Sequence, residues 1–289
     1  MGGNFLGTAI LSRRLGFMAF MLWACSPSTT FSQTPSPLQE WQYSSGIVLE
    51  RLFEPNLPDW RVVLGAGAEA RPLYDGSALS RVQGGPVINI RYNDIAFVSV
   101  GEGVGVNVLR GENYRAGVVL GYDLGRRVED DIGHLHGLGD IGRAPVVKLF
   151  VSYAISKEFP LVLRGDVRQI IGGADGMLAD VGAYFPLPGS SKKFIMFAGP
   201  SITYADHRYL QKEFGVTPAQ ALASGYPVFN PHDGVNAMGF GFSATWFMTD
   251  NWLINMDGAV DQLLGSARES PITQKTVQRA LALSVAYTW

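Results

Sequence analysis

Ser201, Asp206 and His207 have the side-chain types of a hydrolase triad, because a hydroxyl, a carboxylate and an imidazole follow one another closely. A serine hydrolase needs a nucleophile, a base and an orienting acid in one geometry. Proximity in sequence does not establish that geometry. A lipid-modifying hydrolase is therefore kept as the weakest functional alternative, and the sequence predicts no catalytic residues and no enzymatic activity.

The stretch "EDDIGHLHGLGD" offers His134 and His136 beside Glu129, Asp130 and Asp131. Imidazole and carboxylate are suitable metal ligands. The surrounding glycines supply no scaffold that would hold them in place, so a solvated loop facing lipopolysaccharide, with bridging cations, is the preferred interpretation. We expect neither a metal site nor a cofactor.

The glycine-rich "GEGVGVN" at 101–107 superficially resembles a phosphate-binding loop. Such loops join a strand to a helix, whose N-terminal amides point at the phosphate. Both flanks here have the alternation of strands, so the pattern predicts a tight turn.

Composition excludes some functions and favours an unusual surface. Charged residues are 17% of the chain, against about 25% in ordinary soluble domains, while glycines number 35 and aromatic residues reach 11%. The net charge of -2 gives no reason to expect a nucleic-acid partner. With so few charged residues, the surface of this protein must differ from the charged surface of an ordinary soluble domain.

The N-terminal segment has the organisation of an export signal. Arg13 and Arg14 precede the apolar run "LGFMAFMLWAC", and small polar residues follow. The run is shorter than the roughly 20 residues of a transmembrane helix. We assign 1–32 to a signal peptide, 33–58 to a proline-rich periplasmic lead-in and 59–289 to the main domain, and lipidation at Cys25 stays open.

Period-2 alternation over segments of about ten residues recurs from Trp60 to the end of the chain, as in transmembrane β-barrels. In "YRAGVVLGYD" the apolar Ala116, Val118 and Leu120 oppose Arg115 and Asp123. Charges keep to one face, which we place inside the barrel, where they should pair with one another. These interior charges are Arg61, Arg71, Arg91, Arg115, Arg164, Arg168, Asp166, Asp180, Asp257 and Asp261.

Turn signals predict the topology. Short turns fall at 93–94, 111–113, 157–158, 188–191 and 249–251, and longer loops at 73–83, 124–143, 207–234 and 265–276. Splitting the segment 95–111 at Gly101 to Gly103 gives twelve strands, an even number that leaves both termini in the periplasm. Pro200 should cause a bulge or break, because proline cannot donate to the ladder. The fold class is thus an antiparallel all-β transmembrane barrel of about twelve strands.

The loop 207–234 contains a helix signal. Thr217 is a suitable N-cap, Pro218 suits the first helical position, and Gly225 can end the helix after "AQALA". These three residues define a short helix in a long extracellular loop, a candidate lid over the barrel mouth.

The chain ends on "LALSVAYTW", where Leu281, Leu283, Val285, Tyr287 and Trp289 share one face. A last strand that pairs with the first leaves no open edge. The same parity puts Arg279 on the lipid face, where the cost of a charge is small only near the interface.

Several stretches resemble the MipA/OmpV family of Gram-negative outer-membrane proteins: "LGAGAEARPLYDGS", "PVINIRYND", "GADGMLADVGAYFPLP", "FGVTPAQALASG" and "SPIT". The resemblance covers 60–289 and implies a barrel exported across the inner membrane to the outer membrane. For the best-known branch it implies a scaffold that joins a lytic transglycosylase to a murein synthase in the periplasm. It also implies that Leu281, Leu283, Val285, Tyr287 and Trp289 of the last strand form the signal read by the barrel-insertion machinery. A pore for small solutes is the main alternative function.

Overall fold

Residues 59–155 and 161–289 are described by a computed structural model. The expected signal peptide 1–32 with Cys25, the lead-in 33–58 and the turn at 157–158 lie outside the described residues. Within the described part, none of the helices is long and apolar enough to cross a membrane.

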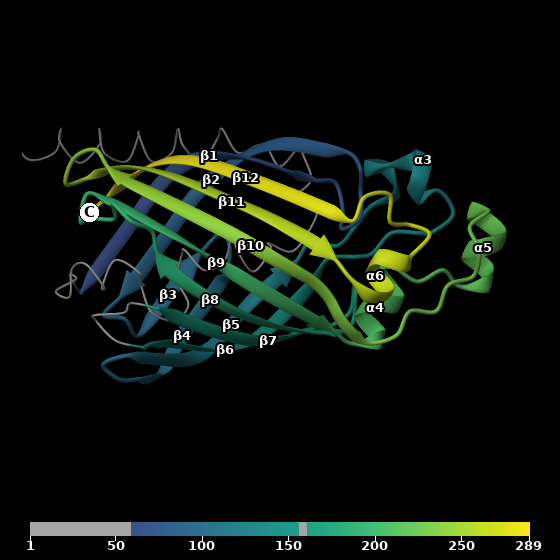
Figure 1. Ribbon diagram of the computed structural model, residues 1–289, viewed down its shortest axis with the longest axis horizontal. Helices are drawn as coiled ribbons and strands as arrows, with labels where there is room; N and C mark the ends of the chain where they lie inside the picture. Colours follow the sequence, from purple (N-terminus) through teal and green to yellow (C-terminus); the bar gives the residue numbers. More distant parts are fainter. Residues whose placement is uncertain (1–58, 156–160) are drawn as a thin grey trace, which may run out of the picture. The chain divides into compact units, whose positions relative to one another are not determined.

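Twelve antiparallel strands close into one barrel in the described part, which confirms the predicted fold class (Figure 1). Each strand pairs with its neighbours in sequence, and β12 pairs with β1 to complete the ring. The strands are β1 (Trp60–Pro72), β2 (Ser80–Tyr92), β3 (Ala96–Ser99), β4 (Gly103–Arg110), β5 (Tyr114–Asp123), β6 (Ala144–Ala154), β7 (Val162–Ile170), β8 (Met177–Pro186), β9 (Phe194–Ala205), β10 (Gly234–Phe247), β11 (Trp252–Leu263) and β12 (Val277–Thr288).

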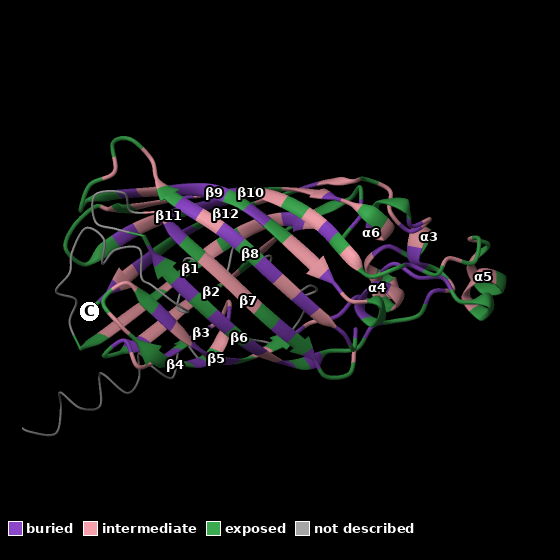
Figure 2. Ribbon diagram, turned by 60° about the horizontal axis from the view of Figure 1, so that its bottom comes forward, coloured by how far each residue is buried: buried purple, intermediate pink, exposed green. Residues whose placement is uncertain are grey.

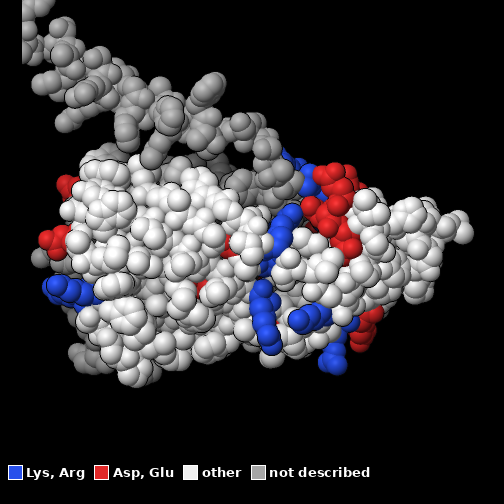
Figure 3. Space-filling model, turned by 90° about the horizontal axis from the view of Figure 1, so that it is seen from above, with Lys and Arg blue, Asp and Glu red and all other residues white. Residues whose placement is uncertain are grey.

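The outer face of the barrel is apolar and exposed. Along each strand exposed and covered residues alternate (Figure 2), and Val82, Leu120 and Val181 expose 75%, 62% and 65% of their surface. On the face shown in Figure 3, most charged side chains gather toward the two ends of the barrel wall. A continuous apolar belt of this kind is the surface that meets lipid in transmembrane barrels.

Aromatic side chains concentrate on the outer face at the end where β1 begins and β12 ends. Trp60 and Tyr92 lie 4.6 Å apart between ring centroids, and Tyr287 contacts both Trp252 and Trp289, at 5.2 and 4.5 Å. Interfacial aromatic girdles flank the apolar band of such barrels, and short turns mark the periplasmic side. This end is therefore the periplasmic end, and the long loops are at the extracellular end.

Turn chemistry explains the short connections. Asn93 and Asp94 both have positive φ, 46° and 54°, the pair of values that a two-residue type I′ hairpin turn requires. The chain also splits near Gly101 to Gly103 as predicted, since β3 ends at Ser99 and β4 begins at Gly103. The loop predicted at 73–83 is shorter in the structure. Strand β2 already begins at Ser80, and residues 80–83 pair with β1.

Pro200 does not break its strand, but the ladder between β9 and β8 is interrupted at Pro200, so the prediction is confirmed for the ladder and wrong for the strand. Strand β9 is continuous, and Pro200 faces outward and is exposed. It stands opposite Phe240 of β10, while the pairs with β8 stop at Gly182 and resume in the same register at Phe185. The register shift of this region lies instead in β10, between Val235 and Ala237.

The extracellular loops carry more helix than the sequence predicted. The described helical segments are η2 (Val128–Asp130), α3 (Ile132–Leu135), α4 (His207–Glu213), α5 (Pro218–Ser224) and α6 (Gly265–Glu269). The predicted helix is α5, with Thr217 in a capping box with Gln220 and Gly225 in the left-handed conformation at φ 81°. The sequence analysis missed α4, whose signal is Asp206, an N-cap that accepts a hydrogen bond from the Tyr209 amide.

Candidate functional site: the lumen and its extracellular cap

The interior face of the barrel carries the predicted charges, and several pair as expected. Arg168 donates to Asp180, which also accepts from Thr203 Oγ1 at 2.5 Å. Arg115 Nε lies 2.5 Å from Asp94 Oδ2. Because these groups are almost fully buried, each ion pair compensates the cost of removing charge from water.

Further ion pairs in the lumen involve partners that the sequence analysis did not name. Lys148 Nζ lies 2.9 Å from Glu102 Oε1. Glu69 lies 3.8 Å from Arg71. Asp94 of the β2–β3 turn forms ion pairs with both Arg91 and Arg115. Glu102 and Asp94 lie on turns, so strand alternation could not assign them to the interior.

Large apolar side chains fill part of the periplasmic half of the lumen. Val162, Tyr184, Ile195 and Phe197 form one buried cluster, against which Phe247 packs. The four residues of the cluster point inward from β7, β8 and β9 and expose at most 6% of their surface. This side of the lumen is packed like an ordinary protein core.

The opposite wall, on β1 and β2, is packed less tightly. Its inward residues alternate with exposed outward ones, and most of them are only half-buried. Gly65, Gly67 and Gly85 leave this wall with little side-chain volume. The inward residues of β1 and β2 thus keep more of their surface exposed than those of the wall from β7 to β9.

Helix α4 covers the extracellular mouth. Tyr209 and Leu210 on α4 and Phe214 after it pack into a buried cluster with Ile170 and Leu178 from the barrel wall. A second buried cluster joins the loops above it and consists of Tyr74, Leu135, Leu138, Val216 and Ile272. The loops at 73–79, 124–143, 206–233 and 264–276 thus form an ordered structure with its own core, which we call the cap.

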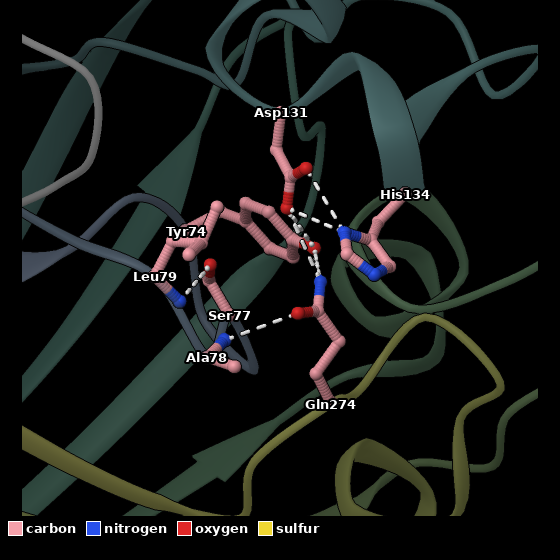
Figure 4. Close-up of polar contacts among 7 residues, drawn as sticks. All are labelled: Tyr74, Ser77, Ala78, Leu79, Asp131, His134 and Gln274. Atoms are coloured by element: carbon pink, nitrogen blue, oxygen red, sulfur yellow. Dashed lines mark hydrogen bonds and ion pairs between the residues drawn. The ribbon is translucent and has the colours of Figure 1, made fainter.

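A polar network ties three of these loops together (Figure 4). The Tyr74 hydroxyl donates to Asp131 Oδ2 at 3.3 Å, and Gln274 Nε2 donates to Asp131 at 3.2 Å and to the Tyr74 oxygen. His134 Nδ1 lies 2.9 Å from Asp131 Oδ1. Burial raises the pKa of Asp131, but its hydrogen bonds with His134 and Gln274 outweigh this, and the pKa lies below its ordinary value. The Asp131 carboxylate is thus the shared acceptor that joins the three loops.

A second electrostatic cluster lies beneath α4. Burial, together with the nearby carboxylates of Asp123 and Asp75, raises the pKa of Glu213 to about 7, although Arg126 acts in the opposite direction. Burial likewise raises the pKa of Asp75. Of these carboxyl groups, Glu213 is the one whose charge changes near neutral pH.

Two of the candidate hydrolase residues, Asp206 and His207, make structural contacts. Ser201 faces the lumen, Asp206 caps α4, and His207 Nδ1 lies 2.7 Å from the Pro231 carbonyl oxygen. Among the described residues no group of His, Cys, Asp and Glu is arranged to hold a metal ion. His136 is exposed.

The loop-lid residues and the terminal residues occupy different ends of the protein. Thr217, Pro218 and Gly225 delimit α5, which extends beyond the cap (Figure 1); it is α4 that contacts the barrel core, and a lid role for α5 stays a prediction. At the other end Leu281, Leu283, Val285 and Trp289 are exposed on the lipid face and Tyr287 packs between two tryptophans. Their role as an insertion signal also stays a prediction.

Comparison with known structures returns several membrane barrels of low similarity. KdgM porin is 9% identical at a TM-score of 0.41, covering 79% of this chain and 99% of its own. The COG4313 outer membrane channel from Pseudomonas putida F1 is 7% identical at 0.39, covering 81% and 97%. The CymD monoaromatic hydrocarbon channel is 10% identical at 0.39, covering 81% and 89%. These barrels are too distant to carry a functional comparison.

No curated protein matches the sequence. The profile of the family described as "MltA-interacting protein MipA" matches residues 64–289, which is almost the whole barrel from the middle of β1 to the last residue. Because this match spans most of the chain and the structure has the expected closed barrel, the protein belongs to the MipA family.

Proposed function

We propose that this protein is an outer-membrane barrel of a Gram-negative bacterium and a scaffold for peptidoglycan-remodelling enzymes. Its partners would be a lytic transglycosylase and a murein synthase of the periplasm. The observation that carries the proposal is the family match, whose description names an interaction with MltA and whose extent is the barrel itself.

A partner in the periplasm can reach only the periplasmic rim of a barrel embedded in the outer membrane. The described rim consists of short turns with exposed charges, among them Glu112, Lys192, Lys193 and Asp250. Lys192 and Lys193 follow each other in the β8–β9 turn, where they offer a positive contact for an acidic surface. At the opposite end, the cap would face lipopolysaccharide, with outer-membrane lipid around the belt.

Chemical crosslinking in envelopes, followed by purification of the tagged barrel, tests the scaffold. We expect a lytic transglycosylase among the crosslinked proteins, and a weaker yield with Lys192→Glu and Lys193→Glu combined. The matched control is Arg208→Glu, which changes an exposed charge of α4 at the extracellular end. Envelopes in which no murein enzyme is captured would contradict the proposal.

A pore for small solutes is the second candidate, and the loosely packed wall of β1 and β2 favours it. The cap lies across the extracellular mouth of that lumen, so conduction requires the cap to open or to be bypassed. Planar-bilayer recordings of the intact protein and of a variant lacking residues 207–233 test whether the barrel conducts with and without the part of the cap that contains α4 and α5. The absence of current in both would exclude a pore.

A further inference from the structure

Arg279 is a cation on the lipid-facing side of the barrel wall. It is exposed and has the outward parity of Leu281 and Leu283 on β12. Its neighbour across the ladder is Val260 of β11, which exposes 48% of its surface. Among the described residues no carboxylate lies within ion-pair distance of Arg279. Its charge is therefore balanced from outside the chain, by water or by an anion.

The position of Arg279 along β12 places this charge at the outer boundary of the membrane. Arg279 precedes Tyr287 of the periplasmic girdle by eight residues. At about 3.4 Å per residue and a strand tilt of about 40°, the two residues are about 20 Å apart along the membrane normal. The apolar band of such barrels is about 25 Å tall, and the long arginine side chain extends toward the polar side. The guanidinium group thus lies at the level of the headgroups of the outer leaflet.

Two further exposed cations lie on the extracellular side of Arg279, in the connection between β11 and β12. They are Arg268 of α6 and Lys275, which precedes β12. Neither forms an ion pair with a described residue. The exposed carboxylate of this connection is Glu269, so the three cations outnumber it.

The connection that carries these cations is compact. The Leu263 amide donates to the Thr276 carbonyl oxygen at 2.8 Å, which closes the loop onto its two strands. Within the loop the Thr273 hydroxyl donates to the Ala267 carbonyl oxygen at 2.6 Å. The cations therefore stand on an ordered rim at the outer ends of β11 and β12.

The positive charge is not evenly spread around the mouth. On the face shown in Figure 3, basic side chains follow one another along the extracellular end of the barrel wall. The connection 124–143, by contrast, exposes the carboxylates of Glu129 and Asp140 together with the single cation Arg143. An anionic partner at the membrane surface is therefore favoured on the β11–β12 side.

We propose that Arg268, Lys275 and Arg279 form a binding surface for the phosphate groups of lipid A, the anchor of lipopolysaccharide in the outer leaflet. Guanidinium and ammonium groups both bind phosphate, the first through a planar fork of donors and the second as a point charge. Phosphate is also the anion found at the level where Arg279 lies. The surface rests on the outer-membrane location in the proposed function, but it requires neither the scaffold role nor a lumen that conducts.

Native mass spectrometry of the purified full-length barrel in detergent tests this surface, with lipid A that carries both phosphates as the probe. We expect the combined variant Lys275→Gln and Arg279→Gln to bind lipid A at least tenfold more weakly than the wild type. The reason is that each basic side chain near an anionic lipid surface contributes about fivefold. Adding Arg268→Gln should weaken binding further. Lipid A stripped of its phosphates should bind the wild type no better than it binds the variants.

The matched control combines Arg110→Gln with Arg143→Gln, which removes two exposed cations from elsewhere on the protein. This control should keep the affinity of the wild type, and Arg279→Lys, which retains the charge, should keep most of it. Heat modifiability shows that each variant is folded, and the single variant Arg279→Gln serves if a combined one is not. The proposal is overturned if the combined variant binds as tightly as the wild type, or if removing the phosphates leaves wild-type binding unchanged. Neither result bears on the scaffold, which the capture of murein enzymes tests separately.

Discussion

Arg126 connects the second long loop to helix α4 through Glu213. Its Nη1 donates to the Glu213 carbonyl oxygen at 2.6 Å and lies 3.7 Å from Glu213 Oε2. The same guanidinium group lies over the Tyr74 ring, 5.8 Å from its centroid. One cation thus joins three loops of the cap, and it does so beside a carboxyl group whose protonation changes near neutral pH.

The raised pKa of Glu213 predicts a cap that is more stable in acid than in base over one pH window. A pKa raised from 4.5 to about 7 means that the folded state binds the proton more tightly. This contribution, at most about 3 kcal/mol, is complete below pH 4.5 and is lost as the pH rises through 7. Protease resistance of the cap should fall accordingly between pH 5 and about pH 8.

Glu213→Gln should flatten that pH dependence, because the amide cannot ionise. Glu129→Gln is the matched control, since Glu129 is an exposed carboxylate in the same cap. An unchanged pH profile in Glu213→Gln would show that another group governs the cap.

The Asp131 network predicts a local rather than a global loss of stability. Asp131→Ala leaves the Tyr74 hydroxyl and the Gln274 amide without their shared acceptor, at a cost of about 1–3 kcal/mol. We expect faster proteolysis of the loops with the barrel's heat modifiability intact. His136→Ala, in an exposed side chain of the same loop, should change neither. Equal protection in both variants would refute a structural role for the network.

Closure of the barrel predicts that Gly65 tolerates no side chain. A Cβ atom added there would lie 2.2 Å from the Val285 carbonyl oxygen of β12 and 2.6 Å from the Ala286 Cα. Gly65→Val should therefore reduce the folded fraction in the outer membrane. Gly84→Val is the control, because a Cβ atom there meets only the Gly67 carbonyl oxygen at 3.6 Å. Comparable folding of the two variants would contradict the close approach of β1 to β12 at Gly65.

The terminal aromatics should matter for assembly beyond their place in the girdle. Trp289→Ala combined with Tyr287→Ala is expected to lower the amount of heat-modifiable barrel in outer-membrane fractions. Trp60→Ala combined with Tyr92→Ala removes another contacting aromatic pair of the same girdle. If the two double variants lose the same amount, the terminal pair acts only as part of the girdle.

The buried pair of Arg168 and Asp180 predicts a non-additive result. Arg168→Met leaves a carboxylate that also binds Thr203 buried without its cation, which typically costs about 3–5 kcal/mol. Adding Asp180→Leu should restore part of this stability, because no charge then stays buried. Equilibrium unfolding in urea with lipid vesicles measures both, and a double variant less stable than Arg168→Met would contradict the compensation.

Strand alternation, together with the export signal and the alternating short turns and long loops, predicted the barrel from sequence. Val118 and Leu120 could face only lipid once Arg115 and Asp123 faced inward, because side chains alternate strictly along a strand. The same rule assigned the lipid face of β12 and, with the glycines at 101–103, the twelfth strand. Local signals also sufficed for α5, whose Thr217 cap and Gly225 terminus act within one helix.

Contacts between distant loops could be decided only by the tertiary structure. Asp131, Tyr74 and Gln274 are far apart in sequence, and their shared hydrogen bonds follow from where the closed barrel places three loops. Asp94 and Glu102 became lumen charges for the same reason, since turns have no alternation to assign them a face. Strand geometry is a local property that a sequence carries in its spacing, whereas the cap depends on where the closed barrel places its loops.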